Sequence, residues 1–178
     1  MSCISFLTDT SLGLSLMATA CKNSGVIVLW DLNQRKIWCQ MTNPHGKKAI
    51  SSLDFLANEP VLVTASDSDN SIKMWLFEKG QSEPRLLRER SGHSEPPTKI
   101  RFYGGLDDPV NHGARNLITC SQDGNLRDIS LLNEFQSMNF SKKKQLTKLN
   151  EGLHSGPIAS FDFSQFRERD WPNLLTCH

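Results

Sequence analysis

The chain has 178 residues, which is enough for one domain with a sizeable hydrophobic core. Its composition, 38% hydrophobic and 22% charged, excludes disorder of the whole chain, and its formal net charge of +1 excludes a global field that attracts nucleic acid or membranes. No basic N-terminal region precedes an apolar stretch, and no apolar run approaches the ~20 residues of a membrane span. We therefore expect a soluble, intracellular protein.

The number of cysteines is odd, and no two of them form a C-x-x-C pair. This usage predicts free thiols in a reducing compartment, with no disulfide or metal framework. The five are Cys3, Cys21, Cys39, Cys120 and Cys177.

The first recognisable unit is a β-hairpin. Residues 16–20 and 26–31 alternate apolar and small or polar side chains, and the turn cluster 22–25 separates them. Strand, tight turn and strand in this order predict an antiparallel pair that ends at Trp30-Asp31.

The same arrangement returns 45 residues later, because Trp75 follows Trp30 at that distance. Here the strands are 61–65 and 71–76, the turn is 67–70, and another strand is predicted at 50–56 before them.

A third copy has predicted strands at 98–104, 116–121 and 125–129. Its turn contains Asp123-Gly124, a strong hairpin signal because glycine accepts a positive φ without steric cost. Ile129 takes the position that tryptophan holds in the first two copies. One more alternating strand is predicted at 157–164.

Histidine-containing turns precede the copies, at 43–46 with His45, at Gly92-His93 and at Leu153-His154. The unit is therefore a histidine turn, three strands and a fourth strand that leads to the next turn. Unequal spacing is explained by insertions at 106–115 and at about 133–151. The resulting divisions are approximately 1–45, 46–92, 93–153 and an incomplete 154–178.

This pattern resembles the WD-repeat family, in which a Gly-His turn, a Ser-x-Asp-Gly turn and a Trp-Asp pair recur. The resemblance implies an all-β, WD-repeat β-propeller with about three and a half to four blades in an incomplete ring. A hydrogen-bonded chain of histidine, serine or threonine, aspartate and tryptophan can fix each blade. The repeat-network residues are His45, Ser66, Trp75, His93, Ser121, Asp123, Trp30 and Asp31.

We expect this network to be incomplete in two blades. In the second, the turn after Ser66 is one residue longer; in the third, Ile129 replaces tryptophan. Because the repeat explains the positions of these histidines, catalysis or metal ligation by them is disfavoured.

A narrower resemblance rests on the segments 14–31, 92–104 and 169–178. They are similar to the tandem-propeller WD-repeat subunit of the small-subunit processome, in its UtpB subcomplex. Related members carry Gly-His-Ser-x-Pro-x-Thr-x-Ile-Arg, Ser-Gln-Asp-Gly, a basic insertion and a strand ending in Cys-His. The resemblance implies a nucleolar scaffold for pre-rRNA processing, with protein partners and a small nucleolar RNP. That family has two propellers and a helical domain, so we expect this chain to represent part of such a protein.

Motifs for catalysis are missing: there is no phosphate-binding glycine loop, no H-E-x-x-H and no Gly-x-Ser-x-Gly elbow. Cys177-His178 has no third partner at metal-ligand spacing. We expect no enzyme activity, no cofactor, no metal, no small-molecule substrate and no membrane partner. Two alternatives stay open. One is a substrate receptor of a cullin ubiquitin ligase, disfavoured because Trp30-Asp31-Leu32-Asn33 lacks the arginine of a Trp-Asp-x-Arg box; the other is a generic WD-repeat scaffold.

The insertion at 133–151 is the local feature suited to RNA. Its segment 135–150 holds four lysines and no acid, a pattern that usually marks a solvated loop but also suits phosphate contacts. The candidate RNA-contacting residues are Lys142, Lys143, Lys144 and Lys148.

Overall fold

The computed structural model describes residues 3–9, 13–21, 23–46, 48–56, 59–78, 83–104, 116–133, 136–140, 156–164 and 173–178. These residues form fourteen β-strands and no helix, so the prediction of an all-β fold is confirmed. No element in this part of the chain qualifies as a membrane-spanning helix. All five cysteines are free thiols.

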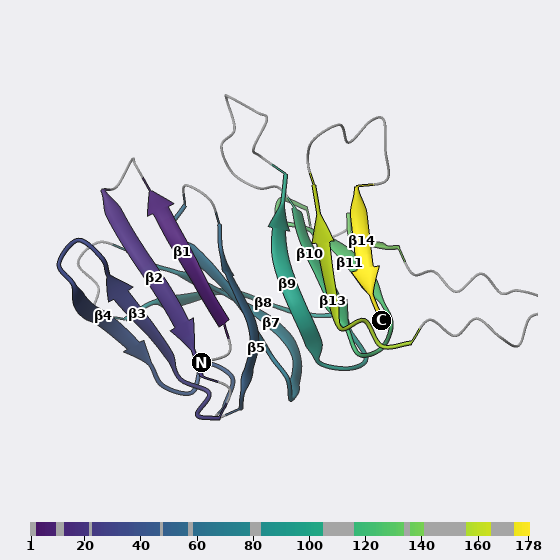
Figure 1. The fold of residues 1–178 in the computed structure, drawn as a ribbon, viewed down its shortest axis with the longest axis horizontal. Coiled ribbons are helices and arrows are strands. Elements are labelled where there is room, and N and C mark those ends of the chain that lie inside the picture. Colours follow the sequence, from purple (N-terminus) through teal and green to yellow (C-terminus); the bar gives the residue numbers. More distant parts are fainter. Residues whose placement is uncertain are drawn as a thin grey trace, which may run out of the picture.

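The strands form four antiparallel sheets that follow one another along the chain, from purple to yellow in Figure 1. The first sheet has the order β1 (Cys3–Asp9), β2 (Leu14–Ala20), β3 (Ile27–Asp31) and β4 (Lys36–Met41). The second has the order β5 (Ile50–Phe55), β6 (Val61–Ser66), β7 (Asp69–Leu76) and β8 (Arg85–Ser91).

The third sheet contains β9 (Pro97–Tyr103), β10 (Asn116–Ser121), β11 (Leu126–Ser130) and β12 (Met138–Asn139), and the fourth pairs β13 (Ser160–Phe163) with β14 (Leu174–Cys177). Strand β12 lies within the segment 133–151 that the sequence assigned to an insertion. It pairs with β11, so this part of the segment is a fourth strand and not a loop.

Three hydrophobic clusters fill the spaces between successive sheets. The first joins Leu29 of β3 to Leu62 of β6, and the second joins Val63 of β6 to Leu117 of β10. The third joins Cys120 of β10 to Phe161 of β13. Because adjacent residues of a strand face opposite sides of a sheet, Leu62 and Val63 enter different clusters. Every residue of β6 is buried, as expected for a strand covered on both faces.

The register reproduces the repeat that the sequence predicts. Trp75 pairs with Leu62, and Ile129 pairs with Leu117 at the corresponding position of the third sheet. Gly124 has a φ of 72° in the turn between β10 and β11, and its N–H donates to the Ser121 carbonyl oxygen over 3.2 Å. Within the described residues, the four sheets do not close a ring.

Candidate functional site: polar networks that order the sheets

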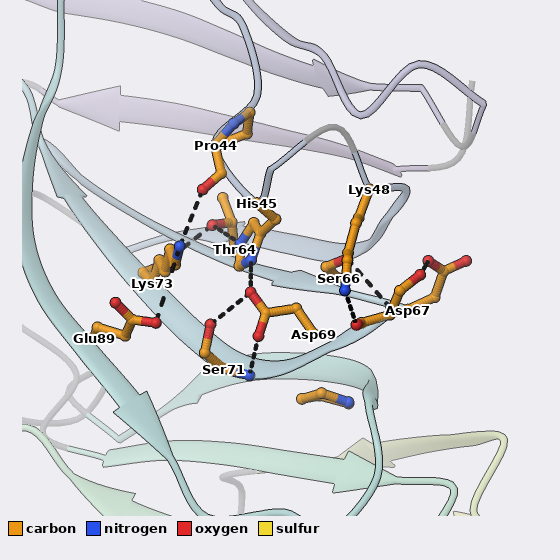
Figure 2. Close-up of polar contacts among 12 residues, drawn as sticks. Pro44, His45, Lys48, Thr64, Ser66, Asp67, Asp69, Ser71, Lys73 and Glu89 are labelled. Carbon is orange, nitrogen blue, oxygen red and sulfur yellow. Dashed lines mark hydrogen bonds and ion pairs between the residues drawn. The ribbon is translucent and has the colours of Figure 1, made fainter.

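The second sheet contains a continuous chain of hydrogen bonds, which Figure 2 shows around Thr64 and His45. The indole Nε1–H of Trp75 donates to Thr64 Oγ1 over 3.0 Å, and Thr64 Oγ1 lies 2.9 Å from His45 Nε2. His45 Nδ1 lies 3.1 Å from Asp69 Oδ2. With the proton of neutral His45 on Nδ1, the threonine hydroxyl donates to Nε2 and each member is satisfied.

This arrangement corrects the expectation that the second network is incomplete. The extra turn residue is absorbed by an irregularity in the β6–β7 register, where Ser66 pairs with Asp69. Asp69 is thereby brought to His45 despite the longer turn. It also accepts hydrogen bonds from the amide and hydroxyl of Ser71, at 3.0 and 2.9 Å, which fix its carboxylate.

The third sheet carries the same chain without its tryptophan. His93 Nε2 lies 2.8 Å from Thr119 Oγ1, and His93 Nδ1 lies 3.3 Å from Asp123 Oδ2. The amide of Ser94 also donates to Asp123. Ile129 occupies the tryptophan position, so this network lacks the indole donor, as expected.

Burial governs the ionisation of these groups. It lowers the pKa of His45 and of His93, although Asp69 and Asp123 favour the imidazolium. Burial alone would raise the pKa of Asp123, but hydrogen bonds from Asn125 and Ser94 and the proximity of His93 lower it to about 2. Both networks therefore hold a neutral histidine against a carboxylate at neutral pH.

The second-strand partners of the histidines are Thr64 and Thr119, not Ser66 and Ser121. Each serine lies two residues further along its strand and donates to backbone: Ser66 to the Ala49 carbonyl over 2.7 Å, and Ser121 to the Glu95 carbonyl over 2.8 Å. Both serines thus tie the second strand to the segment that precedes the first strand.

The threonines had a signal in the sequence. Thr19 and Thr64 are 45 residues apart, the same interval as Trp30 and Trp75. In the first sheet, Trp30 Nε1–H donates to Thr19 Oγ1 over 3.0 Å. The repeat therefore includes a threonine eleven residues before each of these tryptophans, a spacing at which the two side chains meet across the strand pair.

Asp31 does not take part in a histidine network. Its Oδ1 accepts hydrogen bonds from the amides of Asn33 and Gln34, at 2.8 and 3.0 Å, and caps the turn between β3 and β4. The candidate RNA-contacting residues, Lys142, Lys143, Lys144 and Lys148, lie outside the described residues.

The networks have a structural role, since both ring nitrogens of His45 and of His93 are occupied by protein groups. In the part of the chain that the structure describes, no group of three or more histidine, cysteine or acidic side chains is arranged to hold a metal ion.

Comparison with known proteins agrees with this architecture. The family described as "WD domain, G-beta repeat" matches residues 37–75. The chain is 37% identical over 185 residues to human "WD repeat-containing protein 36", covering 98% of this chain and 19% of that protein. It is 36% identical over 184 residues to "U3 small nucleolar RNA-associated protein 21 homolog" of Schizosaccharomyces pombe, covering 100% of this chain and 19% of that protein.

The chain thus spans about a fifth of the length of these curated relatives. Among solved structures, "Structure of U3-55K" superposes with a TM-score of 0.56 at 16% identity, covering 88% of this chain and 39% of the other. That likeness concerns the fold. The repeat, the four successive sheets and these relatives together show that the chain belongs to the WD-repeat family of β-propeller proteins.

Proposed function

We propose that this chain is part of a non-catalytic scaffold of the small-subunit processome, acting in pre-rRNA processing and small ribosomal subunit biogenesis in the nucleolus. The observation that carries the proposal is the 36% identity, over the whole chain, to a protein named for its association with U3 small nucleolar RNA. Its partners would be other processome proteins, together with pre-rRNA or a small nucleolar RNP, in part through indirect contacts.

The geometry supports a binding role. A propeller holds its connecting loops on a rigid set of sheets, and such loops present partner-binding residues. His45 and His93 each contact an aspartate and a threonine through their two ring nitrogens, so these histidines are used within the sheets. This arrangement supports a scaffold in preference to an enzyme.

The test is affinity purification of the full-length protein, followed by sequencing of the RNA and identification of the proteins that co-purify. The proposal expects enrichment of U3 small nucleolar RNA and pre-rRNA over a purification with an unrelated WD-repeat protein. Recovery of cullin subunits without these RNAs would contradict it and favour a ubiquitin-ligase receptor.

The lysines of the insertion remain part of the proposal as possible RNA contacts. Replacement of Lys142, Lys143, Lys144 and Lys148 by glutamine is expected to flatten the salt dependence of RNA binding by about 0.7 per lost phosphate contact on a log–log plot. An unchanged slope would leave these lysines as solvated surface residues.

A further inference from the structure

The outer strand of the second sheet carries arginines where the outer strand of the first carries buried apolar residues. In the first sheet, Cys39 and Met41 are each 7% exposed and belong to the cluster between the first two sheets. Cys39 pairs with Leu29, and Met41 pairs with Ile27. The residues 45 positions after Leu29 and Ile27 are Met74 and Ile72 of the second sheet. Their partners on the outer strand are Arg88 and Arg90. Arg88 is exposed and Arg90 is half-buried. The outer strand therefore contributes apolar groups to the boundary between the first two sheets and arginines to the boundary between the second and third.

The neighbouring sheet contributes a third arginine to the same boundary. Arg88 Nη1 donates to the carbonyl oxygen of Leu131, just after β11, over 3.2 Å. A β-carbon at Gly92, just after β8, would lie 2.8 Å from Arg127 Nη1 of β11. Strands β8 and β11 thus run past each other in opposite directions, and Arg90 lies on the stretch between these two contacts. We call Arg88, Arg90 and Arg127 the arginine cluster.

Arg127 lacks the facing carboxylate that its counterpart in the second sheet, Lys73, has. Lys73 holds the corresponding position in the second sheet, opposite Glu89, with 3.9 Å between Nζ and Oε1. Arg127 is opposite Asn139. Among the described residues no carboxylate pairs with Arg127, and its Nε is buried without a hydrogen-bond partner. Arg127 as a whole is half-buried, and a half-buried cation without a carboxylate partner is favoured by an anion supplied from outside.

We propose that the arginine cluster binds the phosphodiester backbone of an RNA strand. Alternate residues of a strand are about 6.8 Å apart, so the side chains of Arg88 and Arg90 leave β8 at a spacing that suits a polyanion. Guanidinium groups match phosphate oxygens bidentately. Neither β8 nor β11 contains an aromatic residue, so the arginines would contact the RNA through its phosphates and not through its bases.

RNA is favoured over an acidic protein segment by what surrounds the arginines. The centre of a protein interface is enriched in apolar groups. Leu86 and Leu87 of β8 are 44% and 43% exposed. The two β8 positions that correspond to Cys39 and Met41 of the first sheet nevertheless hold arginines, so this stretch of the boundary is cationic. The choice of RNA as the polyanion rests on the proposed function; the cationic site itself rests on the geometry.

The test is binding of the intact protein to an unstructured 12-nucleotide RNA, measured by fluorescence anisotropy over a salt series. The double variant Arg88→Gln/Arg90→Gln is expected to bind about tenfold more weakly at low salt, with a log–log salt slope shallower by roughly 1.4 for two lost contacts. The control Lys36→Gln/Lys48→Gln removes the same charge from exposed positions elsewhere and is expected to bind as the wild type does. Melting temperatures establish that both variants are folded.

A second variant tests the site while all three arginines are retained. Asn139→Glu places a carboxylate opposite Arg127, as Glu89 stands opposite Lys73. It is expected to weaken RNA binding several-fold while the melting temperature is kept or raised. Wild-type affinity in both Asn139→Glu and the double arginine variant would overturn the proposal, and so would equal losses in the lysine control.

An oligoglutamate peptide of the same length serves as the competing partner. If the peptide binds the wild type more tightly than RNA does and depends on the same arginines, the site is a protein interface and the RNA assignment is wrong. The two experiments distinguish failure of the arginine-cluster proposal from failure of the proposed function. Recovery of U3 RNA with the intact protein, together with arginine-independent binding of the oligonucleotide, would overturn the cluster alone. Arginine-dependent binding without U3 recovery from cells would overturn the proposed function alone.

Discussion

In the second sheet, a single threonine hydroxyl is the hydrogen-bond partner of both the Trp75 indole N–H and His45 Nε2. Thr64 is fully buried, accepts the Trp75 indole N–H and donates to His45. In the third sheet, Thr119 is equally buried but serves only His93. A buried polar group without a partner costs more free energy than a typical hydrogen bond contributes. Loss of the Thr64 hydroxyl would leave two such groups, and loss of the Thr119 hydroxyl would leave one.

The near-isosteric change Thr64→Val is therefore expected to cost more than Thr119→Val. The first leaves the Trp75 indole and His45 Nε2 unpaired, about 2–4 kcal/mol in all, and the second leaves only His93 Nε2, about 1–2 kcal/mol. The measurement is the free energy of unfolding from urea denaturation of the intact protein. Equal costs would show that the indole hydrogen bond adds nothing to the network.

Acid should weaken the fold through the same histidines. Their pKa values in the folded protein lie below the ordinary 6.5, chiefly because burial disfavours the imidazolium. The unfolded chain then binds more protons, so stability is complete above about pH 6.5 and falls as the pH drops below it. Asp123, with a pKa of about 2 against an ordinary 3.8, adds a second loss between those values. Unfolding free energies from pH 8 to 5 should decline, and the decline should be smaller in His45→Gln than in the wild type.

At the scale of the strands, the first strand of each sheet is linked to the first strand of the next. Asp54 of β5 accepts a hydrogen bond from Ser5 Oγ of β1 and another from the Phe102 amide of β9, each over 3.2 Å. Thr98 of β9 donates to the Ile158 carbonyl, near β13, over 2.9 Å. Polar side chains thus link the first strands of successive sheets, in addition to the apolar clusters between the sheets.

Asp54→Ala should consequently loosen three sheets at once. It removes the acceptor of the buried Phe102 amide and of the Ser5 hydroxyl, and is expected to cost about 2–3 kcal/mol. The matched control is Asp162→Ala, at an exposed position of β13, where a surface substitution should cost about 0.5 kcal/mol or less. Hydrogen exchange at the Phe102 amide should accelerate in the first variant. Equal unfolding free energies for the two variants would contradict the linking role.

The sequence predicted the strands that are rich in buried apolar residues, including β5, β9 and β13 at sheet edges, and failed to place the polar outer strands. Strand β6 is a continuous β-prone run bounded by turn residues, so its position followed from the pattern. Strand β8, with six of its seven residues exposed, shows no apolar period, and the two-residue β12 lies in a polar segment. Likewise, the Ser-x-Asp-Gly motif favoured Ser66, whereas the 45-residue interval from Thr19 favours Thr64, and the structure shows that Thr64 is the residue that reaches the histidine.

At the scale of the whole molecule, one face of the first sheet carries the same kind of apolar residues as the face of the second sheet that packs against the first sheet. Phe6 pairs with Met17 as Phe55 pairs with Leu62, and Ile4 occupies the place of Leu53. Leu53 and Phe55 are 5% and 6% exposed because the first sheet covers them, whereas Ile4 and Phe6 are 44% and 59% exposed. The first sheet therefore presents, uncovered, a surface whose chemistry is that of a sheet-to-sheet core.

An uncovered apolar face of this kind favours association with a second copy of the chain. The 178-residue polypeptide expressed alone is expected to self-associate, with a sedimentation coefficient that rises with concentration. Ile4→Lys/Phe6→Lys should reduce this rise, because two charges would have to be desolvated for the faces to meet. The control Leu132→Lys changes an apolar side chain that is 77% exposed in the turn after β11 and should leave association unchanged. A wild-type chain that stays monomeric at all concentrations and melts cooperatively would show that the face is stable in water, and that the apolar row contributes to packing only when another sheet is already held against it.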